Sequence, residues 1–213
     1  RPTIDIDLLG ERISNDRENI KAVFQKVCSV ECEDDGVIFD AGSLELEPIA
    51  VEKKYPGICV KVVAHLDTIV QQVSVDIGFG DVVIPCPLTL DYPLLLPHVP
   101  AVELYAYSLE TLIAEKFHAM VDRDESNSRM KDFFDLYQLF TNHEINRELL
   151  SEAIVSTFKN RNTPYRENLA LFSESFAADT TRNIWWKFAL DGFKARPTID
   201  IDLLGERISN DRE

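Results

Sequence analysis

Two aspartates, Asp5 and Asp7, stand two positions apart in a short segment that alternates apolar and acidic residues. This alternation predicts a β-strand over residues 3–9 with both carboxylates on one face. Neighbouring like charges are costly unless a cation neutralises them, and divalent metals held by carboxylates are the usual means of handling triphosphates. A solvated edge strand with outward-facing acids is the commoner explanation of a bare Asp-x-Asp, so the pair needs support from elsewhere.

A third carboxylate, Asp76, lies in a second β-branched segment and is followed by Gly78 and Gly80. Two acids on one strand and a third on another can hold two metal ions, Mg²⁺ or Mn²⁺, around an in-line phosphoryl displacement. An aspartate at a strand end beside a glycine turn explains Asp76 equally well.

A lysine, Lys116, occupies an inward position in the apolar stripe of a predicted helix. A lysine that faces a core needs a carboxylate partner or a cavity, and here it is a candidate for contact with phosphate. The alternative is that its ammonium group extends back to solvent.

Two further acids, Asp132 and Asp135, lie on one side of the next predicted helix. An intrahelical pair with Lys131 is an adequate explanation of Asp135. Asp132 can instead face Lys116 if the two helices pack against each other.

Four blocks of sequence occur in an order that resembles the AbiEii/AbiGii-type toxin nucleotidyltransferase family, a branch of the DNA polymerase beta-like nucleotidyltransferases. The blocks are Arg1-Pro-Thr-Ile-Asp-Ile-Asp-Leu-Leu, Asp76-Ile-Gly-Phe-Gly-Asp81, Glu115-Lys116-Phe and Arg129-Met-Lys131-Asp132-Phe-Phe-Asp135-Leu. Together they span about residues 1–140.

The resemblance implies a metal-dependent enzyme that transfers a nucleoside monophosphate from an NTP to an acceptor, tRNA being one candidate. It also implies a toxin that is accompanied by an antitoxin protein. The implied metal ligands are Asp5, Asp7 and Asp76, and the implied catalytic set adds Lys116 and Asp132. The implied nucleotide-binding residues are Arg1, Lys116, Lys131 and Asp135.

The family also has a Gly-Gly or Gly-Ser loop about ten residues ahead of the Asp-x-Asp, where backbone N–H groups hold the triphosphate. In this chain the position of that loop would lie ahead of residue 1. We therefore expect that a natural N-terminal region, which carries the loop, precedes Arg1. The alternative function is therefore a catalytically incomplete nucleotide- or partner-binding module of the same fold. An Asp-x-Asp phosphatase is disfavoured because Leu8-Leu9 follow the second aspartate.

Hydrophobic patterning places strands first and helices afterwards, which indicates an α+β fold: a mixed β-sheet nucleotidyltransferase core with flanking helices, followed by a C-terminal helical part. We expect a β-rich core over 1–97 and a helical part that completes the site over 98–195. The predicted strands are 3–9, 36–40, 44–49, 57–66 and 69–79, the last two joined by a turn at Asp67-Thr68. The predicted helices are 17–29, 109–120, 131–140, 147–159 and one around Trp185-Trp186, with a proline-rich loop from Pro85 to Pro100.

Residues 196–213 repeat residues 1–18 without a change, so the acidic pair recurs as Asp200 and Asp202. Natural repeats diverge, and an exact copy confined to the two ends is typical of an artificially assembled sequence.

The composition is that of an acidic globular protein, with 213 residues and a net charge of −15. This charge argues against a general nucleic-acid-binding surface, although a local basic patch suffices for an RNA substrate. No run approaches the roughly 18 apolar residues of a membrane span. The four cysteines lack metal-site spacing, which favours free thiols and a cytoplasmic protein.

Overall fold

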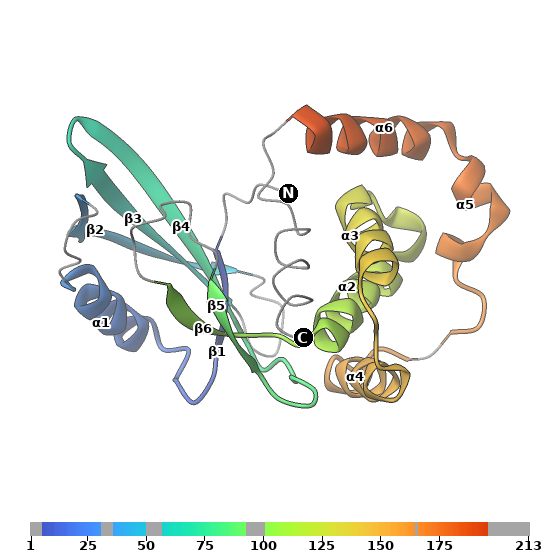
Figure 1. Ribbon diagram of the computed structural model, residues 1–213, viewed down its shortest axis with the longest axis horizontal. Coiled ribbons are helices and arrows are strands. Elements are labelled where there is room, and N and C mark those ends of the chain that lie inside the picture. Colours follow the sequence, from blue (N-terminus) through green and yellow to red (C-terminus); the bar gives the residue numbers. More distant parts are fainter. Residues whose placement is uncertain (1–5, 31–35, 50–56, 93–100, 165, 196–213) are drawn as a thin grey trace, which may run out of the picture. The chain divides into compact units, whose positions relative to one another are not determined.

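The computed structural model describes residues 6–30, 36–49, 57–92, 101–164 and 166–195, and these fall into two compact units (Figure 1). Among the described residues, the sheet unit comprises those up to Asp81 and the helical unit those from Val82 onward. This division follows Asp81, ahead of the junction at residue 97 that the proline-rich segment suggested. Each unit is described below by itself.

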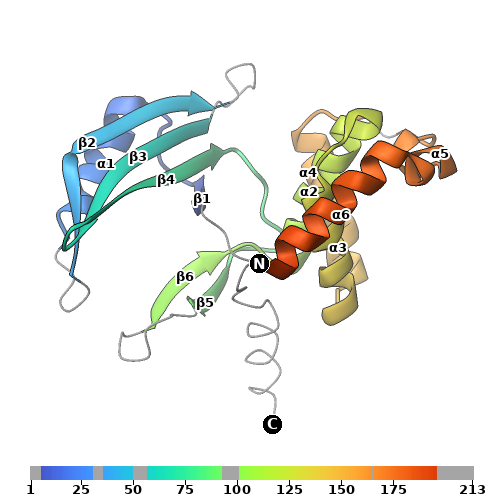
Figure 2. The same cartoon turned by 90° about the horizontal axis from the view of Figure 1, so that it is seen from above.

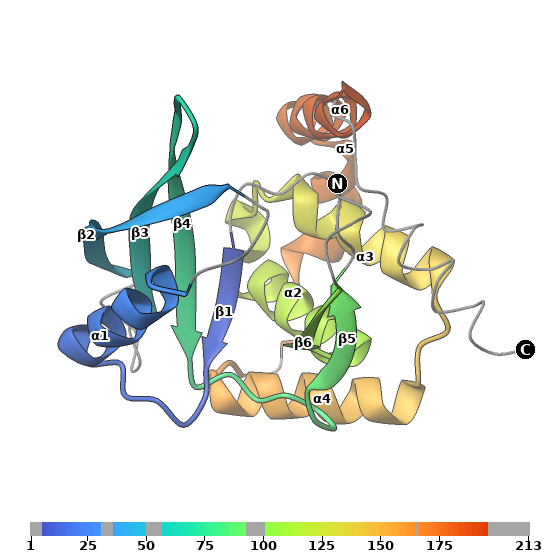
Figure 3. The ribbon, with the colours of Figure 1, turned by 60° about the vertical axis from the view of Figure 1, so that its left-hand side comes forward.

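The described residues of the sheet unit form four strands and one helix, which confirms the expected α+β class with a mixed sheet. Its elements are β1 (Ile6–Gly10), α1 (Arg17–Cys28), β2 (Val37–Ile49), β3 (Gly57–Leu66) and β4 (Ile69–Phe79). The strand order is β1-β4-β3-β2, with β1 parallel to β4 and the other neighbours antiparallel (Figure 3).

The hairpin of β3 and β4 has the boundaries that the β-branched runs predicted, and Asp67 in its two-residue turn has a positive φ of 52°. Aspartate tolerates this conformation better than most residues, which suits it to a tight hairpin. The two short strands predicted over 36–49 are instead one strand with a register shift between Asp40 and Glu45. At this irregularity the Asp40 carboxylate accepts a hydrogen bond from the Gly42 amide at 2.8 Å.

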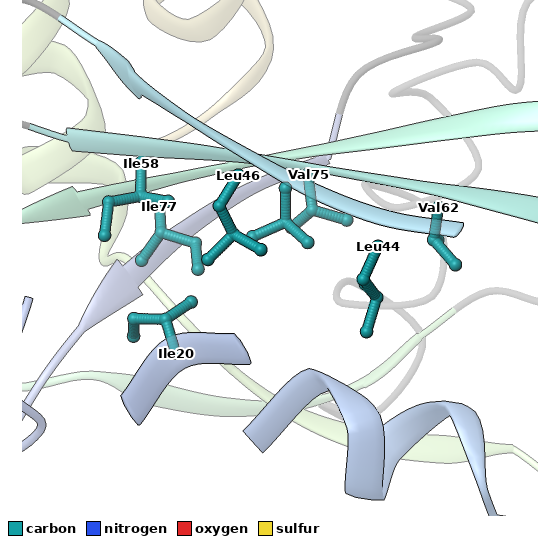
Figure 4. Packing of buried hydrophobic residues seen from close by; sticks show 8 residues of the cluster. Ile20, Leu44, Leu46, Ile58, Val62, Val75 and Ile77 are labelled. Carbon is teal, nitrogen blue, oxygen red and sulfur yellow. The ribbon is translucent and has the colours of Figure 1, made fainter. Parts of the chain in front are cut away.

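Alternation along the strands sends one set of side chains toward α1 and the other set to the opposite face. Helix α1 begins at the N-cap Asp16, whose carboxylate accepts from the Asn19 amide at 3.1 Å, and presents Ile20 to the sheet (Figure 4). The buried cluster there consists of Ile20, Leu44, Leu46, Ile58, Val60, Val62, Val75 and Ile77. Because this core fixes one face of the sheet, it also fixes which side chains occupy the other.

The helical unit begins with a two-stranded hairpin and continues as helices (Figure 2). Its elements are β5 (Leu88–Tyr92), β6 (Val102–Ala106), α2 (Leu109–Arg123), η1 (Asp124–Ser126), α3 (Met130–Asn142), α4 (Arg147–Asn160), η2 (Ala170–Phe172), α5 (Glu174–Ala178) and α6 (Thr180–Ala195). Strand β5 lies within the segment that its prolines predicted to be loop, so that prediction was wrong. The hairpin pairing with β6 supplies the backbone hydrogen bonds that the local sequence did not reveal.

Helix α2 is the central element of this unit, and its start is fixed by buried polar contacts. Ser108 is its N-cap and accepts from the Thr111 amide at 3.1 Å, while the Thr111 hydroxyl accepts from the Ile84 amide at 2.9 Å. Further toward the C-terminal end of α2, an aromatic cluster forms around Phe117, which packs on Phe158 of α4 and on Phe172. Across the described residues, no helix combines the length and apolarity that crossing a membrane would require.

Candidate functional site

The predicted site residues fall into two groups, one in each unit. Asp7 and Asp76 belong to the sheet unit, and Lys116, Lys131, Asp132 and Asp135 belong to the helical unit. Arg1, Asp5 and the repeated pair Asp200 and Asp202 lie outside the described residues.

In the sheet unit, Asp7 and Asp76 are direct neighbours across the parallel pairing of β1 with β4. Paired residues on adjacent strands project from the same face, about 4.8 Å apart from strand to strand. Because Val75 and Ile77 point toward α1, the two carboxylates lie on the face opposite that helix. Asp7 is exposed and Asp76 is half-buried.

The pairing register extends this arrangement into a row across all four strands. The row runs Glu47, Cys59, Asp76, Asp7, and the next row along the sheet contains Glu45, Lys61 and Ser74. We call these two rows the acidic face. They hold four carboxylates against one ammonium group, so a negative field surrounds Asp7 and Asp76.

Lys61 is the cation of the acidic face, and its charge is already engaged. Its Nζ lies 2.6 Å from Oε2 of Glu47, and this hydrogen bond raises the pKa of Lys61. The lysine is therefore paired with an acid on β2 rather than placed between Asp7 and Asp76.

Cys59 stands between Glu47 and Asp76 in the row. Burial raises the pKa of the Cys59 thiol to about 11, with a further contribution from its hydrogen bond to Asp76 and from the charge of that carboxylate. The thiol is therefore protonated at neutral pH and stands beside the Asp76 carboxylate in the pairing of β3 with β4.

In the helical unit, Lys116 of α2 points at two carboxylates of α3. Its Nζ lies 2.6 Å from Oδ2 of Asp135 and 3.3 Å from Oδ1 of Asp132. The side chains are 17%, 8% and 4% exposed, respectively, so this is a buried charge cluster. The expected contact between Lys116 and Asp132 is confirmed, and Asp135 makes the shorter contact.

Asp132 has a second basic neighbour in Arg129, the residue that precedes α3. The Arg129 Nε lies 3.0 Å from Oδ2 of Asp132, but the N–H direction does not give a hydrogen bond, and this buried oxygen has no hydrogen-bond donor among the described residues. With Lys116 and Arg129 against Asp132 and Asp135, the cluster is neutral as a whole.

Glu115, the residue before Lys116, connects the other side of α2 to α4. Glu115 accepts hydrogen bonds from Arg161 at 2.8 Å and from the Thr157 hydroxyl at 3.1 Å, both at the C-terminal end of α4. Glu115 and Lys116 therefore tie α2 to α4 and α3, respectively.

A profile of the nucleotidyl transferase AbiEii toxin family, described as a type IV toxin–antitoxin system, matches residues 1–207. The chain belongs to this family. Neither the curated proteins nor the solved structures that were compared gave a match. Membership confirms the resemblance inferred from the four sequence blocks, and it implies a nucleotide substrate and an antitoxin partner.

The AbiEii family assignment makes the donor chemistry of the acidic face relevant to a divalent cation. Asp7 and Asp76 offer hard carboxylate oxygens side by side, which fits Mg²⁺ or Mn²⁺ better than a softer metal. Across the described residues, no group of three or more His, Cys, Asp or Glu side chains is placed to hold a metal ion. The described contribution to such a site is therefore a pair, and Asp5 lies outside the described residues.

Sequence reasoning missed the partners of several site residues. Cys59 and Glu47 join Asp76 only through strand register, which a single strand's pattern does not encode. Alternation along 57–66 does place Cys59 and Lys61 on the polar face, and that signal was available. Arg129 stands in a quoted sequence block, but its approach to Asp132 depends on how α3 begins.

Proposed function

We propose that this AbiEii-family chain is a metal-dependent nucleotidyltransferase that moves a nucleoside monophosphate from an NTP to a hydroxyl of an RNA acceptor, with tRNA as the first candidate. Asp7 and Asp76, together with Asp5, would hold Mg²⁺ or Mn²⁺. The observation that carries this proposal is the pairing of Asp7 with Asp76 in register on neighbouring strands.

The charge of the acidic face supports the need for a metal. Four carboxylates outnumber the ammonium group of Lys61, and that group is paired with Glu47. A triphosphate approaching Asp7 and Asp76 is repelled unless cations reverse the local field. Asp7 and Asp76 would hold the divalent ion that reverses this field, and the protein's own charges would stay in place.

The transfer conserves atoms and charge in a simple way. A bond forms between the acceptor oxygen and the α-phosphorus, the bond from that phosphorus to the β-phosphate oxygen breaks, and pyrophosphate leaves with those electrons. A carboxylate of the pair Asp7 and Asp76 accepts the proton of the attacking hydroxyl. Bound Mg²⁺ or Mn²⁺ supplies positive charge to the α-phosphate and to the leaving pyrophosphate.

The buried cluster of the helical unit is proposed to bind the nucleotide. Lys116 contacts phosphate and offsets charge on the pyrophosphate, and its two carboxylate contacts hold the ammonium group in one position. Asp132 completes the catalytic set, and Arg1, Lys131 and Asp135 contribute to nucleotide binding.

The biological role proposed is that of a toxin in the cytoplasm of a bacterium, with an antitoxin protein as its partner. Family membership supports the toxin role, and the free thiols of Cys28, Cys59 and Cys86 suit a reducing compartment.

The decisive experiment supplies the full-length protein with Mg²⁺, labelled NTPs and a tRNA pool. Transfer of label to RNA in the wild type and its loss in Asp7→Ala are the expected results. Glu45→Gln, which removes an acid from the adjacent row, is the matched control and should retain transfer. Labelling of RNA that persists in Asp7→Ala would contradict the proposed role of Asp7 and Asp76.

The same protein tests the alternative of a binding module without catalysis. Calorimetry with Mg-NTP measures nucleotide binding independently of turnover. Binding of Mg-NTP by a full-length protein that labels no RNA would favour the module over the enzyme.

A further inference from the structure

Cys59 and Asp76 are direct neighbours in the antiparallel pairing of β3 with β4, so a neutral thiol stands beside one of the proposed metal ligands. We infer that Cys59 is a positioning residue, whose thiol donates a hydrogen bond to the Asp76 carboxylate and so fixes the orientation in which that carboxylate binds the divalent cation. This inference rests on the proposed function in taking Asp76 as a metal ligand.

The strand order gives the hydrogen bond a direction. β4 lies between β3, which carries Cys59, and β1, which carries Asp7. A donor on the β3 side draws one oxygen of Asp76 toward Cys59 and leaves the other oxygen toward Asp7. The second oxygen is the one that can share a cation with Asp7.

Without such a donor, we expect the carboxylate of Asp76 to rotate away from Asp7. The final torsion of an aspartate is broad, and the negative charge of Asp7 on the next strand repels the carboxylate. In the described row, the side chains other than Cys59 are carboxylates, so Cys59 holds the proton that can be donated.

A thiol also suits this position because it is neutral. A lysine at the same place would orient Asp76 but would neutralise the charge that the cation needs. The thiol is a weak donor and leaves the carboxylate its full negative charge. Partners that hydrogen-bond to metal ligands commonly change metal affinity by about 10- to 100-fold when removed, and a weak donor belongs at the lower end.

The test measures Mn²⁺ binding to the full chain by the electron paramagnetic resonance signal of free Mn²⁺, without nucleotide or turnover. Cys59→Val approximates the side-chain volume without the donor, and Cys59→Ser retains a donor. We expect about tenfold weaker Mn²⁺ binding in Cys59→Val and affinity within about twofold of wild type in Cys59→Ser. Cys28→Ala, which removes a thiol from α1, is the control and should bind as wild type.

Several outcomes overturn the inference: unchanged or tighter binding in Cys59→Val, or a loss in Cys59→Ser as large as that in Cys59→Val. Circular dichroism identifies a variant that fails to fold, and Cys59→Ala then replaces Cys59→Val. If wild type binds Mn²⁺ but transfers no nucleotide, the proposed function fails while the Cys59 effect stands. If wild type is active and Cys59→Val retains full affinity, only the role of Cys59 fails. Absence of Mn²⁺ binding in wild type overturns both.

Discussion

In the sheet unit, Asp7 and Asp76 project side by side from neighbouring strands in a row whose described members include no basic side chain. In the helical unit, Asp132 and Asp135 converge on Lys116, and Arg129 adds a second positive charge. The first pair has a negative charge that the fold does not compensate, whereas the second group is neutral, with its two carboxylates buried. Uncompensated charge indicates where a ligand must supply the missing partner, whereas the compensated cluster stabilises the helical unit and holds Lys116 in one position.

The largest effect should come from removing Lys116. Lys116→Met leaves two buried carboxylates without their common cation, which should lower the free energy of unfolding by about 3–5 kcal/mol. Both tryptophans lie in α6 of the helical unit, so their fluorescence during urea titration reports on this unit. Lys61→Met removes a lysine from the exposed acidic face, and circular dichroism should show an unfolding midpoint close to wild type. Equal losses in the two variants would remove the distinction between the units.

Asp7→Asn should separate activity from stability in the sheet unit. Nucleotide transfer should fall by more than about a hundredfold, because even the outer partners of metal ligands commonly cost 10- to 100-fold. The unfolding midpoint should stay unchanged or rise, since Asp7 is exposed and its repulsion of Asp76 is relieved. A large loss of stability in Asp7→Asn would mean that the pair is structural.

Divalent metal should stabilise only one of the two units. At ten times its dissociation constant, a cation that binds the native state adds about 1.4 kcal/mol. Hydrogen exchange with and without Mg²⁺ should therefore show added protection in β1 and β4, while α2 and α3 exchange as before. Asp7→Asn should abolish the Mg²⁺-dependent protection of β1 and β4. Added protection confined to α2 and α3 would mean that the metal binds the helical unit, which would contradict the prediction.

The smallest effect concerns the reactivity of Cys59. The Asp76 charge and hydrogen bond contribute to the raised pKa of this thiol, so Asp76→Asn should lower the pKa and increase the thiolate fraction at pH 8. Alkylation by iodoacetamide, followed peptide by peptide with mass spectrometry, should be several-fold faster, up to about tenfold for one pKa unit. The exposed Cys86 serves as the internal control. An unchanged rate at Cys59 would contradict the contact with Asp76.

What the sequence predicted well was set by local periodicity. The β-branched runs and the Asp67-Thr68 turn predicted the β3–β4 hairpin, because a two-residue turn leaves little freedom in register. The interrupted apolar stripe of α2 identified Lys116 as inward-facing, and a buried ammonium group requires the acidic partners that it has.

What the sequence could not predict depends on contacts between distant segments. The neighbours of Asp76 follow from the pairing of three strands, and the parallel pairing of β1 with β4 arises after α1, β2 and β3 have intervened. Strand β5 was missed because its hydrogen bonds come from β6, across residues 93–100. The stronger contact of Lys116 with Asp135 reflects how α2 packs on α3, which periodicity alone does not specify.

Strand β1 has five described residues, and among the described strands β4 is its neighbour in the sheet. Its last residue, Gly10, lies against the Phe79 ring so closely that an added Cβ would be 2.3 Å from Cε1. The spacing from Gly10 back to Asp7 therefore sets which residue meets Asp76. Ile6 and Leu8 are each about half exposed, so evolution can replace them with other strand-forming residues. A single-codon insertion or deletion between Asp7 and Gly10 would turn the carboxylate to the opposite face, so this segment should evolve by replacement at constant length.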